Sequence, residues 1–182
     1  MMKSSVILIG IACCMLISCK STLSPAQMAE KEAQAALEKV EYDNAVQALN
    51  KQEFVLEADR INFKRGRFVY VSANTNFVAL NGNQATIQMA FNSPYAGPNG
   101  IGGITVEGNA SNIQINTDKN GNITVSMMVQ GVAVSADVTL RMTNGSNRCT
   151  ATINPNFSGN RIEFTGLLYP ESESNVYKGR SL

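Results

Sequence analysis

The spacing of apolar and polar residues changes twice along the chain and divides it into three parts. The chain opens with an apolar run at Val6–Ile17, and apolar residues at helical spacing follow to about residue 52. Apolar and polar residues then alternate over Phe54–Tyr169. Alternation with a period of two gives each strand one buried and one wet face, which is typical of antiparallel sheets. The pattern predicts a helical segment over 26–52 and an antiparallel β domain over 53–170.

The alternating region predicts nine or ten short strands that follow one another in hairpins. The longest alternation is Val132–Thr143, and Asn-Gly pairs at Asn120-Gly121 and Asn144-Gly145 provide the positive φ that tight turns need. A parallel sheet would need crossover helices between its strands, and the region has no helical pattern. We therefore expect a mainly β (α+β) fold, in which a strongly bent antiparallel sheet forms a sandwich or a partly closed barrel. The strands are expected at Phe54–Ala58, Phe68–Ser72, Phe77–Leu80, Thr86–Phe91, Ile104–Glu107, Ile113–Thr117, Ile123–Val129, Val132–Thr143, Cys149–Ile153 and Arg161–Leu168.

The helical segment carries two apolar stripes on roughly opposite faces. Its start is marked by an N-cap serine, a proline and a glutamine in Ser24-Pro25-Ala26-Gln27. One amphipathic helix cannot bury both faces against one surface, so we expect a break near Glu41–Asp43, with Asp43 as a new N-cap. The alternative is one continuous helix that is covered on two sides. The stripes are Ala29, Ala33, Ala36, Leu37 and Val40, and then Tyr42, Ala45, Val46 and Leu49.

The opening apolar run predicts an exported protein with a lipid anchor. Val6–Ile17 follows Lys3 and is too short to span a bilayer, so it is typical of a signal peptide. The segment Leu16-Ile17-Ser18-Cys19 resembles the bacterial lipobox, which implies cleavage before Cys19 and acylation of that residue. We therefore expect a lipoprotein signal peptide at 1–18 and a lipidated Cys19 with a tether at 19–25. The alternative is an ordinary secretory signal that contains a cysteine.

Charge and cysteine content exclude several classes of partner and cross-link. Without Lys3 the lysines and arginines equal the acidic residues in number, so nucleic acid is not an expected partner. With Cys13, Cys14 and Cys19 removed or acylated, Cys149 is the last free thiol, and no intramolecular disulfide can form. Cys149 alternates with polar neighbours, which favours a small buried apolar side chain over a reactive thiol.

The residue types also weaken the case for catalysis. The chain contains no histidine, so it has no imidazole to activate a nucleophile or to bind a metal. The acidic residues of the later strands are single and widely spaced. We therefore expect no catalytic residues, no metal site and no cofactor, although folding could still pair distant carboxylates.

Two segments stand out as candidate binding elements. The segment 92–103 is long for a hairpin connection and contains two prolines, four glycines, Tyr95 and Asn99. It could contact a partner, or it could simply cover a sheet edge. The segment Lys64-Arg65-Gly66-Arg67 follows Arg60 and could bind a carboxylate, a phosphate or a lipid headgroup. Alternatively, these cations stay solvated or pair with Glu57 or Asp59.

These segments also resemble a known family. Lys51-Gln52-Glu53-Phe54-Val55-Leu56-Glu57-Ala58, Arg65-Gly66-Arg67 and the Pro-Tyr loop that ends in Gly102-Gly103-Ile104 are similar to domain of unknown function family 4251, lipoproteins of Bacteroides-type bacteria. The resemblance spans roughly Ala45 to Tyr169. It implies a signal peptide, a lipid anchor and a β-rich envelope domain, and it implies no activity.

We expect a non-catalytic lipoprotein whose domain binds an envelope protein, a glycan or a small ligand. The contact candidates are Arg65, Arg67, Tyr95 and Asn99. One alternative is a carrier of an apolar ligand, with a cavity lined by Met89, Phe91, Met127, Val138 and Met142. The least supported alternative is an enzyme. Cys19 is not followed by the acidic run that would suggest surface export in this group of lipoproteins, so we expect an outer-membrane anchor that faces the periplasm. The alternative is exposure at the cell surface. We expect a frayed tail over 171–182.

Overall fold

The computed structural model describes residues 24–91, 97–132, 134–156 and 159–181 of the chain. The signal peptide, Cys19 and Tyr95 of the sequence predictions lie outside these ranges. Over the described residues the chain forms one helix, α1 (Pro25–Lys51), and two short 3₁₀ turns, η1 (Ala73–Thr75) and η2 (Glu171–Glu173). The strands in the same ranges are β1 (Glu53–Phe63), β2 (Phe68–Tyr70), β3 (Phe77–Asn81), β4 (Gln84–Ala90), β5 (Gly103–Thr117), β6 (Ile123–Gly131), β7 (Ser135–Met142), β8 (Arg148–Pro155) and β9 (Ile162–Pro170).

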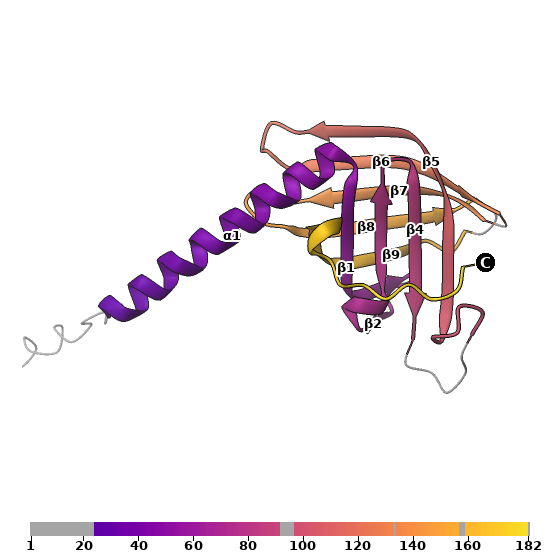
Figure 1. Ribbon diagram of the computed structural model, residues 1–182, viewed down its shortest axis with the longest axis horizontal. Helices are drawn as coiled ribbons and strands as arrows, with labels where there is room; N and C mark the ends of the chain where they lie inside the picture. Colours follow the sequence, from indigo (N-terminus) through magenta and orange to yellow (C-terminus); the bar gives the residue numbers. More distant parts are fainter. Residues whose placement is uncertain (1–23, 92–96, 133, 157–158, 182) are drawn as a thin grey trace, which may run out of the picture. The chain divides into compact units, whose positions relative to one another are not determined.

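The strands form a closed antiparallel barrel of eight strands, which confirms the predicted mainly β class. The pairing runs β1-β3-β4-β5-β6-β7-β8-β9, and β9 pairs back onto β1 (Figure 1). Gly166 of β9 lies at this seam, where a Cβ atom would come within 1.9 Å of the Glu57 carbonyl oxygen. The sheet closes through this pairing, although residues 111–117 of β5 pair only with β6 among the described strands. Strand β2 is an addition that pairs only with the second half of β1.

Apolar side chains fill the barrel interior. The buried core cluster includes Phe54, Leu56 and Ile61 of β1, together with residues from every other strand of the barrel. Met127, Val138 and Met142, expected above to line a ligand cavity, belong to this cluster, and Met89 and Phe91 pack against it. An eight-stranded barrel has an interior that side chains can fill. These five residues are therefore packing residues of the core.

The two Asn-Gly turns agree with the sequence prediction, whereas some strands differ in extent. β1 continues to Phe63, past the predicted end at Ala58, and β7 begins at Ser135 instead of Val132. Gly121 and Gly145 adopt φ of +81° and +78°, as expected for the two Asn-Gly turns. The two strands expected at Ile104–Glu107 and Ile113–Thr117 are one strand, β5, which contains a bulge between Ser111 and Gln114. The polar residues between the two apolar runs therefore continue the strand instead of ending it.

Helix α1 is continuous, so the predicted break near Asp43 is wrong. The first stripe, with Leu37 and Val40, stays exposed, and only the second stripe buries Ala45 and Leu49. The break was predicted because one helix could not bury both stripes against one surface. Since only the second stripe is buried, a continuous helix meets no such conflict. A hydrogen-bonded ion pair from Lys39 to Asp43, one turn apart, bridges the position at 2.8 Å. No helix in the described part of the chain has both the length and the apolar character needed to cross a membrane.

The chain divides into two compact units. Of the first, residues 1–34, only the part from Ser24 is described, and it begins α1 with a reciprocal capping pair between Ser24 and Gln27. The second unit, Ala35–Leu182, contains the rest of α1 and the whole barrel. This unit holds every site considered below.

The C-terminal tail is ordered on the barrel, so the predicted frayed tail is wrong. Figure 1 shows the yellow tail running across the strands on the face toward the viewer. The buried Gln88 side chain of β4 donates to the carbonyl oxygen of Tyr177 at 2.7 Å and accepts from the amide of Gly179 at 2.8 Å. Hydrogen bonds from Lys178 and Ser181 lower the pKa of Glu107. The tail shows no periodic pattern of apolar residues, because it binds the barrel through backbone hydrogen bonds and not through an apolar face.

Candidate functional site

The β1–β2 hairpin presents the basic segment predicted from the sequence. The amide of Phe63 donates to the carbonyl oxygen of Arg67 at 2.7 Å, which closes the turn around Lys64, Arg65 and Gly66. Arg65 adopts φ of +74°, a left-handed conformation that L side chains rarely take. Lys64, Arg65 and Arg67 are all exposed. The turn therefore gathers three solvent-facing cations at the end of two strands.

A pocket of about 440 Å³ lies against this turn. Two cations of the turn, Lys64 and Arg65, line it, and Arg161 adds a third from the loop before β9. Glu163 is the one carboxylate in the lining, and it accepts a hydrogen bond from Asn62 at 2.9 Å. The lining thus holds more positive than negative charge, so it suits an anionic group.

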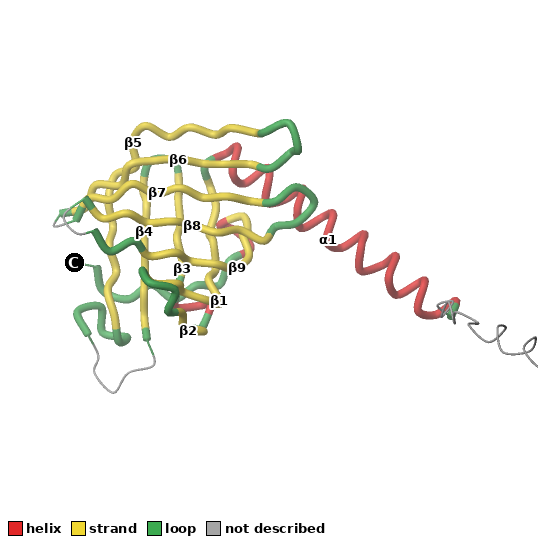
Figure 2. Tube along the Cα trace, turned by 180° about the vertical axis from the view of Figure 1, so that it is seen from behind, coloured by secondary structure: helices red, strands yellow, loops and turns green. Residues whose placement is uncertain are grey.

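Exposed aromatic side chains lie next to the cations, on β2. Phe68 is 53% exposed and Tyr70 is 77% exposed, and their rings meet edge to face at 5.6 Å between centroids. The Arg60 guanidinium lies 5.9 Å from the Phe68 ring centroid, within the range of a cation–π contact. Figure 2 shows β2 at one end of the barrel beside β1. The hairpin therefore combines exposed cations with an exposed apolar surface.

The period-two pattern does not predict this aromatic surface. It predicts an ordinary strand of the β domain from Phe68, with one face buried. All three residues of β2 are exposed. The available signal was the run Phe68-Val69-Tyr70, which is apolar at every position instead of alternating.

Asn99 is buried, which corrects its prediction as a contact residue. Its side chain is 2% exposed, and its Oδ1 accepts from the amides of Ile101 and Gly103 at 3.1 and 2.9 Å. Its Nδ2 donates to Thr105 Oγ1 at 3.3 Å. The side-chain amide of Asn99 therefore holds the loop together through hydrogen bonds within the chain, and it does not face a partner. The structure does not bring Asn99 together with Arg65 and Arg67 in one pocket.

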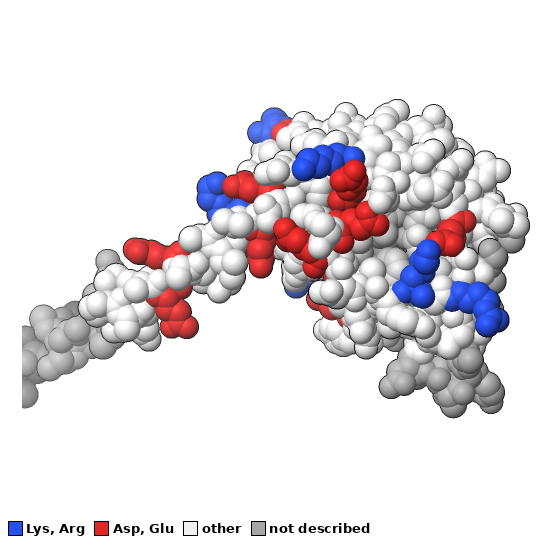
Figure 3. Space-filling view, viewed as in Figure 1, with Lys and Arg blue, Asp and Glu red and all other residues white. Residues whose placement is uncertain are grey.

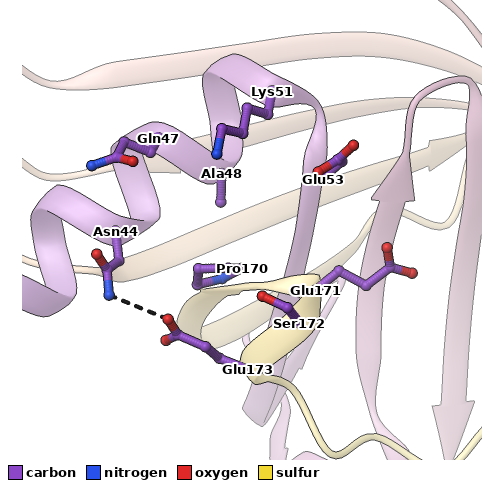
Figure 4. A pocket seen from close by; sticks show the side chains of 9 residues that line it. All are labelled: Asn44, Gln47, Ala48, Lys51, Glu53, Pro170, Glu171, Ser172 and Glu173. Carbon is purple, nitrogen blue, oxygen red and sulfur yellow. Dashed lines mark hydrogen bonds between the residues drawn. The ribbon is translucent and has the colours of Figure 1, made fainter.

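A second pocket, of about 490 Å³, lies between the end of α1 and η2 (Figure 4). Its lining includes Glu53, Glu171 and Glu173, and acidic side chains gather in this region in Figure 3. Asn44 donates to Glu173 at 3.3 Å, and Asn81 donates to Glu171, whose side chain points away from the helix in Figure 4. Two of the three carboxylates therefore fasten η2 to the barrel and to α1. No local pattern predicted this cluster, because Glu53 lies far from Glu171 and Glu173 in the chain.

Cys149 is buried in the core, as the alternation predicted. Burial raises the pKa of its thiol to about 12. A thiolate is the reactive form of cysteine, so this side chain is inert in the folded protein. Within the described ranges, no group of three or more His, Cys, Asp or Glu side chains is placed to hold a metal ion.

The fold and these pockets define a mainly β protein, a closed eight-stranded antiparallel barrel preceded by a helix, with a basic and aromatic hairpin at its surface. Residues 36–168 match the family "Domain of unknown function (DUF4251)", and the chain belongs to this family. The match begins before Ala45, where the sequence resemblance was expected to start, and so includes the second half of α1.

A solved structure supports the same assignment. The chain is similar to a DUF4251 family protein from Bacteroides eggerthii DSM 20697, whose crystal structure was determined at 1.95 Å resolution. The two are 50% identical with a TM-score of 0.69, and the match covers 82% of this chain and 100% of the other. The comparison with curated proteins gives no match.

Proposed function

We propose that this protein is a lipid-anchored, non-catalytic binding module of the cell envelope, which contacts an anionic partner through its β1–β2 hairpin. The observation that carries the proposal is the separation of charge on a nearly neutral chain. The segment from Arg60 to Tyr70 contains four cations and no acidic residue, and it also holds the exposed Phe68. Exposed apolar surface that is rimmed by polar residues is typical of an interaction site.

The chemistry of the side chains supports a binding role over catalysis. The sequence has no histidine, and its last cysteine, Cys149, is buried with a raised thiol pKa. Glu171 and Glu173 in the larger pocket accept hydrogen bonds from asparagines that hold the fold together. These carboxylates have structural partners, so they do not form a free acid–base pair.

The location is proposed from the first part of the sequence. The apolar run before Cys19 and the lipobox-like Leu16-Ile17-Ser18-Cys19 support cleavage and acylation at Cys19. Several acyl chains on one residue hold a protein stably at a bilayer. We place the anchor in the outer membrane with the domain facing the periplasm, because no acidic run follows Cys19.

Chemical cross-linking in cells tests the binding role. We expect the double variant Arg65→Ala/Arg67→Ala to lose the cross-linked products that the natural protein forms. The matched control is Lys119→Ala/Arg141→Ala, which removes the same charge from two exposed positions on other hairpins. Cross-links that persist in the first variant, or that disappear equally in both, would remove the hairpin from the binding site.

A further inference from the structure

We propose that the anionic partner of the β1–β2 hairpin is the headgroup layer of a phospholipid bilayer. In this arrangement the pocket beside Lys64 and Arg65 receives lipid phosphates, and Phe68 and Tyr70 lie at the boundary between headgroups and acyl chains. The inference rests on the proposed function, because it names the partner of the same hairpin.

The positive charge of the hairpin matches a phosphate surface. Lys64, Arg65 and Arg161 line the pocket, and the only carboxylate there, Glu163, already accepts a hydrogen bond from Asn62. Arg67 adds an exposed cation beside the pocket. Lysine and arginine near an anionic membrane surface are attracted to it, and arginine binds phosphate oxygens through two hydrogen bonds.

The aromatic residues favour a bilayer interface. Phe68 pairs with Asn62 and Tyr70 pairs with Arg60 across the two strands, so the rings share one face with a guanidinium group. Tyrosine and other amphipathic aromatic side chains are enriched at membrane–water interfaces, where one end is apolar and the other is wet. Arg60 lies against the Phe68 ring and can keep its charge at headgroup level.

The length of β2 argues against a peptide that would add to the sheet. β2 is an edge strand, since it pairs only with β1 among the described strands, but it has just three residues. A peptide added to so short an edge would gain few main-chain hydrogen bonds, and such bonds supply the affinity in that mode of recognition. A bilayer needs no such edge, because it accepts the side chains directly.

The backbone conformation of the turn indicates that an arginine side chain at position 65 has a functional role. Arg65 and Gly66 both have positive φ, of +74° and +77°. Glycine or asparagine would adopt this conformation with less strain than arginine. A residue held in an unfavourable conformation suggests a functional constraint, and here the side chain lines the basic pocket.

Sedimentation with vesicles tests the inference on a chain that begins at Ser24. This chain lacks the apolar leader but contains the whole compact unit Ala35–Leu182, and a crystallised relative is folded although its whole chain covers only 82% of this one. The vesicles are phosphatidylcholine with and without about one third phosphatidylglycerol. We expect binding to the anionic vesicles, and we expect Arg65→Ala/Arg67→Ala to weaken it roughly thirty-fold.

Two further variants separate the aromatic contribution from general effects. Phe68→Ser/Tyr70→Ser is expected to weaken vesicle binding, whereas Tyr177→Ser, which removes another exposed aromatic ring, is expected to leave it unchanged. Lys119→Ala/Arg141→Ala is the control for charge. If the chain does not bind anionic vesicles, or if all variants bind alike, the bilayer inference is overturned. Cross-links that still depend on Arg65 and Arg67 would then leave the proposed function standing with a protein partner.

Discussion

At the scale of single residues, Arg65 is the position where we expect folding stability and the proposed binding to favour different side chains. Its left-handed φ of +74° disfavours any side chain with a Cβ atom. Its neighbour Arg67 is not among the residues with positive φ. The same substitution at these two positions should therefore have opposite effects on folding, while both remove a cation from the same surface.

We predict that Arg65→Gly stabilises the fold by about 1 kcal/mol, because the strain of the left-handed residue exceeds the entropy that glycine gains on unfolding. Arg67→Gly should lower the stability, since no strain is relieved there. Urea unfolding of the two variants measures both effects. Both variants should bind anionic vesicles less tightly, so Arg65→Gly would be more stable and yet weaker in binding. A loss of stability in Arg65→Gly would contradict this account of the turn.

Cys149 gives a second prediction at this scale, which concerns pH. Its thiol pKa rises from an ordinary value of 9.0 to about 12 in the folded protein, because burial disfavours the thiolate. Between these values the unfolded chain loses the thiol proton and the folded chain retains it, so stability falls as pH rises. From about pH 8 to about pH 10, the natural protein should lose about 1.4 kcal/mol more than Cys149→Ala. Equal pH dependence of the two proteins in urea unfolding would show that the thiol ionises freely.

At the scale of elements, the alternating pattern predicted most strands because each has one face in the core. The pattern is a poor guide where burial does not follow a simple period. It predicts two strands in place of β5, a break in α1 at Asp43 although one face of that helix is solvated, and a tail without structure. The tail depends on backbone hydrogen bonds with distant segments, which no local pattern of apolar residues records. The basic turn could be predicted because its residues are consecutive in the sequence, at Lys64-Arg65-Gly66-Arg67.

The tail provides the prediction for this scale. A chain that ends at Glu173 loses the hydrogen bonds that residues of the tail make with Asn74, Gln88 and Asn99. At roughly 1 kcal/mol for each of these four bonds, we expect a loss of about 4 kcal/mol in the free energy of unfolding. The control chain ends at Arg180 and keeps these bonds. Urea unfolding compares the two chains, and identical midpoints would mean that the tail binds without stabilising the barrel.

At the scale of the whole molecule, the barrel acts as a rigid support for one charged hairpin. Its sheet is closed by the pairing of β9 with β1, and the side chains expected to line a cavity pack in or against its core. Closure itself could not be predicted from the sequence, since sandwiches and barrels share the same alternation. A lipid anchor at Cys19 would hold the domain near a bilayer, where the hairpin could make contact repeatedly. The central claim is that this hairpin is the part of the domain that meets the membrane.

A polarity-sensitive fluorophore at Val69 tests this claim most directly. In the chain from Ser24, Cys149 is the only natural cysteine and is buried, so Val69→Cys can be labelled at one site, with Lys119→Cys as the control on another hairpin. When anionic vesicles are added, we predict a blue shift in emission for the label at position 69 and none for the label at position 119. A shift at position 119 alone, or at neither position, would contradict the account.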